Sequence, residues 1–517
     1  MLRNLSGAGA VAREAPFIVI GAGTVGLPFA LRLAELTGQR VVCLESGGAV
    51  QEAETHPLNR VVQHGMEYGG AEHGRFRCLG GTSTRWGGAL IPFQQADLAG
   101  AGWPIAMDQL LPYLGEVEAL FGLEPGAYSD GQFPAELGGS YINRLAKWPE
   151  FRKRNVWSLV GPAARSHPLV EIWTDATVTA IALDQGKVRL EAQSLDGQDR
   201  LSVSGERLVI AAGAIETTRL ALLMDRQNGG CIAAASPALG RYFTDHISVV
   251  VGELVERQRA ALNRIIGFRF GARGAMRNIR FELAPDAPAR AELPPGFAHI
   301  GFDAEVPGGF DVLRDIFRAL QQRRLPGWGS LWGLLANAPW LARAVWWRFV
   351  HKRLLFPAGA GLQLHMVAEQ EPRADSCIAL SATETDRFGQ PLAEIDWRVS
   401  AGDVAHVVRH AQDFAAAWNS STLAALGRID LHDAATIGSD LAHSGGIYHP
   451  TGSTRMGASA AEGVVDPDLR VFAAPQVQLL ATSVLPTGGG ANPTMMLMLL
   501  AMRCAAQHGA LAQGGGA

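Results

Sequence analysis

Two short stretches near the C-terminal end of the chain carry residue types that could do chemistry. The first, HPTGSTRMG, begins at His449, and the second, GGGANPTMMLMLL, places Asn492 forty-three positions later. An imidazole titrates near neutrality and can take a proton from a hydroxyl group, and a carboxamide can donate a hydrogen bond to the oxygen left behind. We therefore interpret His449 as a general base and Asn492 as its partner. The structural alternatives are an ordinary core histidine and an asparagine that only caps the helix beginning at Pro493.

The other end of the chain carries a glycine-rich fingerprint. The apolar run FIVI at 17–20 precedes Gly21, Gly23 and Gly26 in GxGxxG spacing, followed by the helical pattern LPFALRLAEL and the strand pattern RVVCLE. Such glycines allow a tight turn and the close approach of a pyrophosphate, and the helix N-terminus offers N–H groups to it. Glu45, 19 positions after Gly26, can accept hydrogen bonds from ribose hydroxyls. The fingerprint predicts a dinucleotide site, disfavours NADP, and leaves FAD and NAD open.

Composition limits the remaining classes of function. The chain has 517 residues, of which 48% are hydrophobic and 18% charged, and its net charge of −4 indicates no nucleic-acid partner. The length favours two domains. No CxxC pair occurs, so we expect neither a disulfide framework nor a metal site, and a reducing compartment is favoured. The N-terminus lacks the apolar segment of a secretory signal, and we expect no membrane-spanning helix.

A second glycine-rich loop helps to decide between FAD and NAD as the cofactor. It reads RCLGGTSTRWGGALIPF at 77–93, and small residues in it let the backbone lie against a flat ligand. Together with the fingerprint and HPTGSTRMG…NPT, this loop resembles the glucose–methanol–choline (GMC) family of FAD oxidoreductases. Further matching motifs are ERLVIAAGAIETTRLALL, LGRYFTDH and GVVDPDLRV, in the order of the family. The resemblance extends from residue 17 to about 505 and is weak over 250–435. GGTSTRWGG and TGGGANPT look most like the pyranose-oxidase side of the family.

The resemblance implies a set of site residues. His449 and Asn492 would lie together over the isoalloxazine ring, and Val178 near the adenine. The helix after Asn492 would aim its N-terminus at the flavin. Thr84 and Arg85 stand where some relatives carry a flavin-linked histidine, so the FAD is expected to be non-covalent. The implied cofactor-binding residues are Gly21, Gly23, Thr24, Val25, Gly26, Glu45, Gly81, Thr82, Ser83, Trp86, Gly87, Val178, Ala212, Gly213, Ser483, Asn492, Pro493 and Thr494.

We expect an α/β fold with two domains. The first is a Rossmann-type FAD-binding domain, discontinuous over 12–245 and 436–517, with a covering excursion at about 95–150. The second, a substrate-binding domain at 246–435, is built on a mostly antiparallel sheet that roofs the flavin. Alternating polar and apolar residues in FGARGAMRNIRFELAP predict one of its strands, and SAGDVAHVVRHAQDFAAAWN predicts a helix that Ser400 caps.

The segment 326–357 stands apart because it holds five of the chain's 12 tryptophans among several arginines and lysines. One interpretation is an amphipathic helical pair that packs on the substrate domain or across a dimer interface. The other is a peripheral helix on a membrane, or a lid over the substrate.

The function expected from the resemblance is oxidation of an alcohol to a carbonyl, with hydride transfer to flavin N5 and His449 as base. The substrate would be a sugar or glycoside hydroxyl, and the electron acceptor oxygen or a quinone-like carrier. Two alternatives stay open: oxidation of a bulky hydrophobic alcohol such as a sterol, and a catalytically silent flavin-binding scaffold at a membrane. The expected location is the cytoplasm, with the inner membrane face as a site of peripheral attachment.

Overall fold

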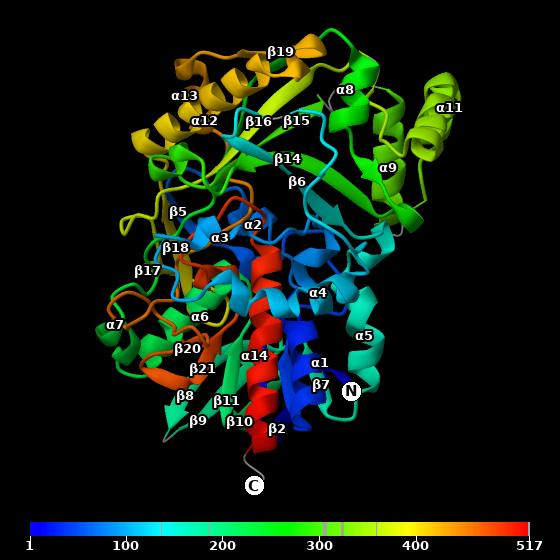
Figure 1. Cartoon of the computed structure of the whole chain (residues 1–517). Coiled ribbons are helices and arrows are strands. Elements are labelled where there is room, and N and C mark those ends of the chain that lie inside the picture. Colours follow the sequence, from blue (N-terminus) through cyan, green and yellow to red (C-terminus); the bar gives the residue numbers. More distant parts are fainter. Residues whose placement is uncertain (136, 185, 303–307, 322–324, 358, 515–517) are drawn as a thin grey trace.

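The chain forms two bodies of secondary structure, each built around its own sheet (Figure 1). The computed structural model describes residues 1–135, 137–184, 186–302, 308–321, 325–357 and 359–514. The lower body in Figure 1 contains both termini, and the upper body carries the long strands β12 and β16. The fold is thus the expected combination of an α/β body with a second body on an antiparallel sheet.

A parallel sheet forms the centre of the lower body. Its strands lie in the order β1 (Leu2–Asn4), β7 (Val170–Thr174), β4 (Val41–Leu44), β3 (Phe17–Ile20), β11 (Arg207–Ile210), β21 (Ala474–Leu479) and β20 (Arg470–Val471). All neighbours are parallel except β20 and β21. The strand β3 is fully buried, as its continuous apolar run predicts for a strand covered on both faces. The carboxyl ends of β3, β4 and β11 therefore meet at one edge, where α/β sheets bind ligands.

Helices and a smaller sheet cover this parallel sheet. Helix α1 (Gly26–Thr37) follows β3 and packs against α5 (Val156–Ser166) and α14 (Thr494–Gly514), and α6 (Ala214–Gln227) follows β11. The smaller sheet is ordered β2 (Ala10–Glu14), β10 (Arg200–Gly205), β9 (Lys187–Gln193) and β8 (Thr177–Asp184). The short helices of this body are α2 (Gly70–His73), α3 (Gln95–Leu98), α4 (Leu114–Phe121) and α7 (Cys231–Ala235).

The upper body is an antiparallel sheet covered by helices on its outer face. The strands run in the order β13 (Arg269–Phe270), β14 (Met276–Leu283), β15 (Gly296–Phe302), β16 (Leu362–Glu369), β12 (His246–Glu256) and β19 (Gly427–Leu431), and β6 (Tyr141–Trp148) pairs with β14. Helix α12 (Ala401–Ser420) begins at the expected cap, where Ser400 Oγ accepts the Asp403 N–H. Helix α13 (Ala434–Leu441) lies beside it, and α8 (Arg259–Ile266) follows β12.

The expected domain limits differ from the bodies of the structure in three places. The excursion at 95–150 does more than cover the site, because β6 joins the antiparallel sheet through eight residues paired with β14. Strand β5 (Val62–Gly65) joins β17 (Cys377–Thr385) and β18 (Pro391–Trp397) in a third sheet. The limit at 435/436 falls inside α13, whose Ile437 and Leu441 are buried in the upper core. Residues 515–517 of the expected range lie outside the described residues.

Helix α14 is the one described helix that is long and apolar enough to cross a membrane by length and composition. However, 67% of its most apolar window is buried inside the protein, where it packs on α1. We therefore assign it to the core of the lower body, since a buried core helix passes the same test. It begins at Thr494, one residue later than expected, and the Pro493 carbonyl accepts a hydrogen bond from the Leu497 N–H, as an N-cap carbonyl does.

Candidate functional site

A cleft opens at the edge where β3, β4 and β11 end, and its floor is the glycine fingerprint. Gly21 has φ of +102°. A Cβ on Gly26 would lie 2.1 Å from the Gly21 carbonyl oxygen, and one on Gly81 would lie 2.8 Å from the Cα of Gly23. The fingerprint and the second glycine-rich loop are therefore in backbone-to-backbone contact. A flat or phosphorylated ligand at this position can reach N–H groups that side chains would otherwise cover.

Glu45 closes one end of this cleft at the end of β4. Its Oε2 accepts the Ala22 N–H at 3.0 Å and its Oε1 accepts the Gly47 N–H at 3.0 Å. Burial raises the pKa of the Glu45 carboxyl, against these two hydrogen bonds, which favour the ionised form. Each carboxylate oxygen retains a second acceptor position, so the group can also accept a ligand hydroxyl.

The structure brings most of the expected cofactor residues to this cleft. Those that line it are Gly21, Gly23, Thr24, Val25, Glu45, Gly81, Thr82, Trp86, Val178, Ala212, Gly213 and Thr494. Four others lie behind the walls. Gly26 is packed against Gly21, and Ser83 accepts the Val156 N–H. Ser483 accepts a hydrogen bond from Thr454, and Pro493 precedes α14. These four residues shape the cleft without forming part of its surface.

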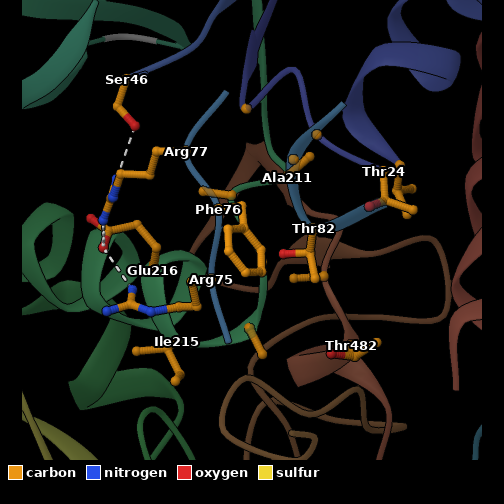
Figure 2. A pocket seen from close by; sticks show the side chains of 18 of the residues that line it. Thr24, Ser46, Arg75, Phe76, Arg77, Thr82, Ala211, Ile215, Glu216 and Thr482 are labelled. Atoms are coloured by element: carbon orange, nitrogen blue, oxygen red, sulfur yellow. Dashed lines mark hydrogen bonds and ion pairs between the residues drawn. The ribbon is translucent and has the colours of Figure 1, made fainter. Parts of the chain in front are cut away.

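The sequence pattern did not reveal a charged cluster that forms one side of the cleft (Figure 2). Glu216, in the first turn of α6, accepts Arg77 at 2.6 Å, Arg219 at 3.0 Å and Arg75 at 3.5 Å. Burial alone would raise the pKa of Glu216, but Arg77, Arg219 and Arg75 outweigh it and hold the pKa at about 2. Arg77 also donates to Ser46 at 2.9 Å, and the Phe76 ring stands beside the cluster in the pocket. The cluster ties the second loop to α6.

A second cavity, of about 300 Å³, adjoins the cleft. Trp86 and Thr494 line both spaces. His449 and Asn492 lie in this cavity and not in the cleft, together with Gly87 and the upper-sheet residues Arg280, Phe297 and His299. The remaining lining residues are Gly88, Ala89, Trp148 and Asn278. The cavity is therefore roofed by the antiparallel sheet and separated from the cleft by shared residues.

One buried carboxylate positions the histidine backbone. Asp245 Oδ1 accepts the N–H groups of both His246 and His449, at 2.7 and 2.8 Å, and Oδ2 accepts Tyr448 N–H at 2.9 Å. Tyr448 has φ of +65°, a conformation that a residue with a side chain adopts at a cost. Burial raises the pKa of Asp245 to about 7, although its backbone hydrogen bonds favour the carboxylate. Asp245 thus fixes the backbone from which His449 projects.

The hydrogen bonds around the two histidines define which nitrogen of His449 is unprotonated. His246 Nε2 lies 2.7 Å from the Gly489 carbonyl oxygen, which can only accept, so Nε2 carries the hydrogen. Burial lowers the pKa of His246 to about 4, and the ring is neutral with an acceptor at Nδ1. His449 Nδ1 lies 3.3 Å from that acceptor and must donate. His449 Nε2 is then unprotonated.

Asn492 leads to the same assignment from the other side. Arg280 Nη2 lies 2.8 Å from Asn492 Oδ1, and a guanidinium can only donate, so the amide oxygen faces Arg280. The amide nitrogen faces His449 Nε2 at 3.1 Å, which is therefore an acceptor. Burial, His246 and Arg280 all lower the pKa of His449 well below its usual value. A hydroxyl group in the cavity would reach this acceptor by displacing the Asn492 N–H, which could then donate to the hydroxyl oxygen.

Asp245, His246 and His449 lie close enough together to suggest a metal site, with one ligand atom from each within 4.8 Å of the others. We assign the cluster to hydrogen bonding instead. The oxygens of Asp245 take four backbone N–H groups, and His246 uses its two nitrogens for Gly489 and His449. Each candidate ligand atom thus has a partner.

The sequence analysis missed His246, which contacts His449, and Arg280, which lines the cavity. His246 ends the motif LGRYFTDH, which was noted only for its resemblance. Arg280 lies in the strand pattern RNIRFEL, where alternation predicts the strand but not the face of the sheet that meets His449. Local patterns contain no signal for a contact that depends on the meeting of β12, β14 and the C-terminal segment.

Part of the sequence matches a known family, and two curated enzymes are similar to the chain. Residues 372–501 match the C-terminal domain of the GMC oxidoreductase family. A 2-methyl-1,2-propanediol dehydrogenase from Mycolicibacterium austroafricanum is 24% identical, over 95% of this chain and 94% of that enzyme. A patulin synthase from Aspergillus clavatus is also 24% identical, over 45% of this chain and 50% of its own length.

Solved structures show the same fold. The pyridoxine 4-oxidase from Mesorbium loti superposes with a TM-score of 0.60 at 17% identity, over 95% of this chain and 98% of its own. A fungal aryl-alcohol oxidase gives a TM-score of 0.55 at 15% identity, over 96% and 99% of the two chains. The comparisons therefore show a GMC oxidoreductase C-terminal domain at residues 372–501 and, over nearly the whole chain, the fold of these two oxidases.

The Glu216 cluster generates a prediction about stability. The change Glu216→Gln should lower the free energy of unfolding at pH 7 by about 3 to 5 kcal/mol, because three arginines would lose their buried carboxylate. The folded-state pKa of about 2 lies below the usual 4.5. The contribution is therefore present above pH 4.5 and is lost as pH falls towards 2. Urea unfolding at several pH values from 7 down to 3 should show that the difference in unfolding free energy between the variant and the parent becomes smaller as the pH falls.

The matched control is Glu384→Gln, which removes a carboxylate from an exposed ion pair with Arg60. Exposed pairs contribute about 0 to 1 kcal/mol, so this variant should unfold almost as the parent does. Equal destabilisation by both changes would contradict the assignment of a structural role to the buried cluster.

Proposed function

We propose that the chain binds FAD non-covalently in the cleft and oxidises a small polar alcohol in the adjoining cavity. The observation that carries the proposal is the unprotonated Nε2 of His449, which accepts the Asn492 amide N–H in a cavity that shares Trp86 and Thr494 with the cleft. A catalytically silent scaffold would have no need of a fixed tautomer in that position.

The cleft fits the dinucleotide on its residues alone. The close glycine contacts leave backbone N–H groups accessible, and Glu45 is positioned for ribose at the end of β4. Val178 lines the cleft at the same end of the sheet, where an adenine would lie. Among the described residues that line the cleft there is no histidine or cysteine, which supports non-covalent binding. Bound FAD would supply the acceptor for the hydride that leaves the alcohol carbon.

The chain's own part in the reaction is proton transfer and positioning. His449 Nε2 would take the hydroxyl proton, and the Asn492 N–H would donate to the oxygen as negative charge develops there. His246 would keep the acceptor lone pair on Nε2 by accepting from Nδ1. The aromatic walls Trp86, Trp148 and Phe297 would limit access of water.

The size of the cavity bears on the substrate class. A volume of about 300 Å³ lies at the lower end of the usual range for ligand pockets, roughly 300 to 1,000 Å³. A small alcohol or a single sugar ring is therefore favoured over a sterol. The electron acceptor we propose is oxygen or a quinone-like carrier. The five cysteines are all unpaired, and we propose a cytoplasmic location on that basis.

The tryptophan-rich segment 326–357 supports a further contact. It forms α10 (Trp328–Ala336), α11 (Ala338–Trp346) and a π-helical turn (Trp347–His351), which pack with α9 (Gly309–Gln321) at the side of the upper body (Figure 1). Trp328 and Trp332 are 82% and 71% exposed, whereas Trp347 is buried. An anionic membrane surface or a second copy of the chain would cover these rings.

The base assignment predicts that His449→Ala slows flavin reduction by about 10² to 10⁴-fold while FAD stays bound. Anaerobic stopped-flow bleaching of the flavin band by a panel of alcohols and sugars measures this rate. Because the pKa of His449 is lowered below its usual 6.5, the parent should retain its full rate below pH 6.5. The control is His443→Ala, an exposed histidine nearby, with a rate close to that of the parent. An undiminished rate in His449→Ala would refute the assignment.

The tautomer assignment predicts that His246 matters through the acceptor at Nδ1. His246→Phe keeps the ring volume but removes the acceptor, and the limiting rate should fall roughly 10-fold, the value of one hydrogen bond of about 1.4 kcal/mol. His246→Asn places an amide oxygen near the same position and should recover part of the rate. Substrate affinity should change little in either variant. Equal rates in the Phe and Asn variants would exclude the orienting role.

The exposed tryptophans predict binding to a membrane surface, which a vesicle flotation assay can detect. The parent should float with vesicles that contain anionic lipid, and the combined change Trp328→Ser, Trp332→Ser and Trp346→Ser should abolish flotation. The control is Leu511→Ser, which changes an exposed apolar residue of α14, outside the segment 326–357. This variant should float as the parent does. If the parent remains in the unbound fraction but elutes as a dimer that the triple change dissociates, the surface is an interface between copies.

A further inference from the structure

Arg280 is the feature of the cavity that alcohol oxidation alone does not explain. Its side chain lies on β14, is 2% exposed and lines the cavity beside His449 and Asn492. Its guanidinium lies over the Phe297 ring, 4.1 Å from the centroid. Nη2 donates to Asn492, but Nε and Nη1 are buried without a hydrogen-bond partner among the described residues. Buried arginines usually have all their donors satisfied, so two unpartnered groups require an explanation.

No carboxylate of the described residues lies within ion-pair distance of Arg280, although Glu282 acts on its charge from further away. The nearest acid on its strand, Glu282, is already paired with Arg144 at 2.9 Å and accepts Gln94 at 2.9 Å. Arg280 forms no ion pair with any carboxylate in the described part of the chain. Burial lowers the pKa of Arg280 to about 10, which leaves the group protonated at neutral pH. A charge removed from water in this way is costly unless an anion joins it.

The rest of the cavity adds no negative group. None of the described residues that line it is an aspartate or glutamate, and burial lowers the pKa of His299 to about 3, so this ring is neutral. His299 Nδ1 is also without a partner among the described residues. The cavity therefore presents a fixed positive charge with unpartnered donors on the side formed by the antiparallel sheet.

From these observations we propose that the alcohol substrate carries a carboxylate, or a similar anionic group, that binds Arg280. This inference rests on the proposed function and narrows its substrate class to small hydroxy acids, including sugar acids. One carboxamide, that of Asn492, separates the guanidinium from the imidazole. The anionic group therefore lies within a few bonds of the carbon that bears the reacting hydroxyl. The anion would supply the acceptors that Nε and Nη1 lack.

The test compares each hydroxy acid with its neutral amide. Glycolate is paired with glycolamide, and 3-hydroxypropanoate with 3-hydroxypropanamide, in anaerobic flavin reduction by the holoenzyme. We expect an apparent dissociation constant at least about 30-fold lower for the acids, the scale on which a buried charge pair contributes. In Arg280→Met the apparent dissociation constants of the acids and the amides should become nearly equal. Arg280→Lys should retain part of the preference for acids. Asn278→Asp keeps Arg280 but adds a carboxylate to the cavity and should also weaken the preference for acids.

Binding without turnover gives an independent readout. Calorimetry of the holoenzyme with propanoate and propanamide should show tighter binding of propanoate, and loss of this difference in Arg280→Met. Neutral alcohols that reduce the flavin as well as the acids do would overturn the inference and leave the proposed function intact. If no alcohol of either kind reduces bound FAD, the proposed function fails, and calorimetry alone decides on the anion site. Equal slowing of acids and amides in Arg280→Met would overturn the inference, because Arg280 would then act only through Asn492 or the flavin.

Discussion

Asp245 is the constraint on which the arrangement of the site depends. A single oxygen of its carboxylate holds the backbone N–H groups of two histidines that are about two hundred positions apart in the chain. His246 begins β12 of the upper sheet, and His449 belongs to the loop that returns to the lower body. The carboxylate therefore joins the two bodies at the point where the imidazoles meet. Without this link, the left-handed turn at Tyr448 would have no compensation, and the His449 side chain would have no fixed direction.

The direction of the hydrogen bonds follows from two groups, one of which can only accept and the other only donate. The Gly489 carbonyl accepts only, and the Arg280 guanidinium donates only. Starting from either end, the chain of partners arrives at a lone pair on His449 Nε2. Neutral histidines and a rotatable amide could each adopt two states, but the two fixed ends leave one combination. The low dielectric of the buried site strengthens this preference, because a wrongly oriented member would leave an unpaired group.

Local sequence signals predicted the elements of the fold, and long-range pairing determined the rest. The fingerprint from Phe17 to Glu45 and the capped helix after Ser400 lie where the patterns indicated. The pairing of β6 with β14 spans more than a hundred positions, and no local pattern encodes such a register. For the same reason the sequence identified His449 and Asn492 as a pair but not His246 or Arg280. Neighbouring tryptophans show the limit clearly, since Trp346 is exposed and Trp347 is buried.

The order of strands in the parallel sheet has a consequence for how the protein is made. Strands β3 and β4 emerge early from the ribosome, yet β21 beside β11 and the helix α14 against α1 come from the last fifty residues of the sequence shown. The hydrophobic surface of α1 is fully covered only once α14, more than 450 positions later, has been synthesised. Nascent chains of this topology expose apolar surface for a long time, which is the circumstance in which chaperones are needed. The proposed dinucleotide, whose cleft includes Thr494, could likewise bind its full site only after α14 has been synthesised.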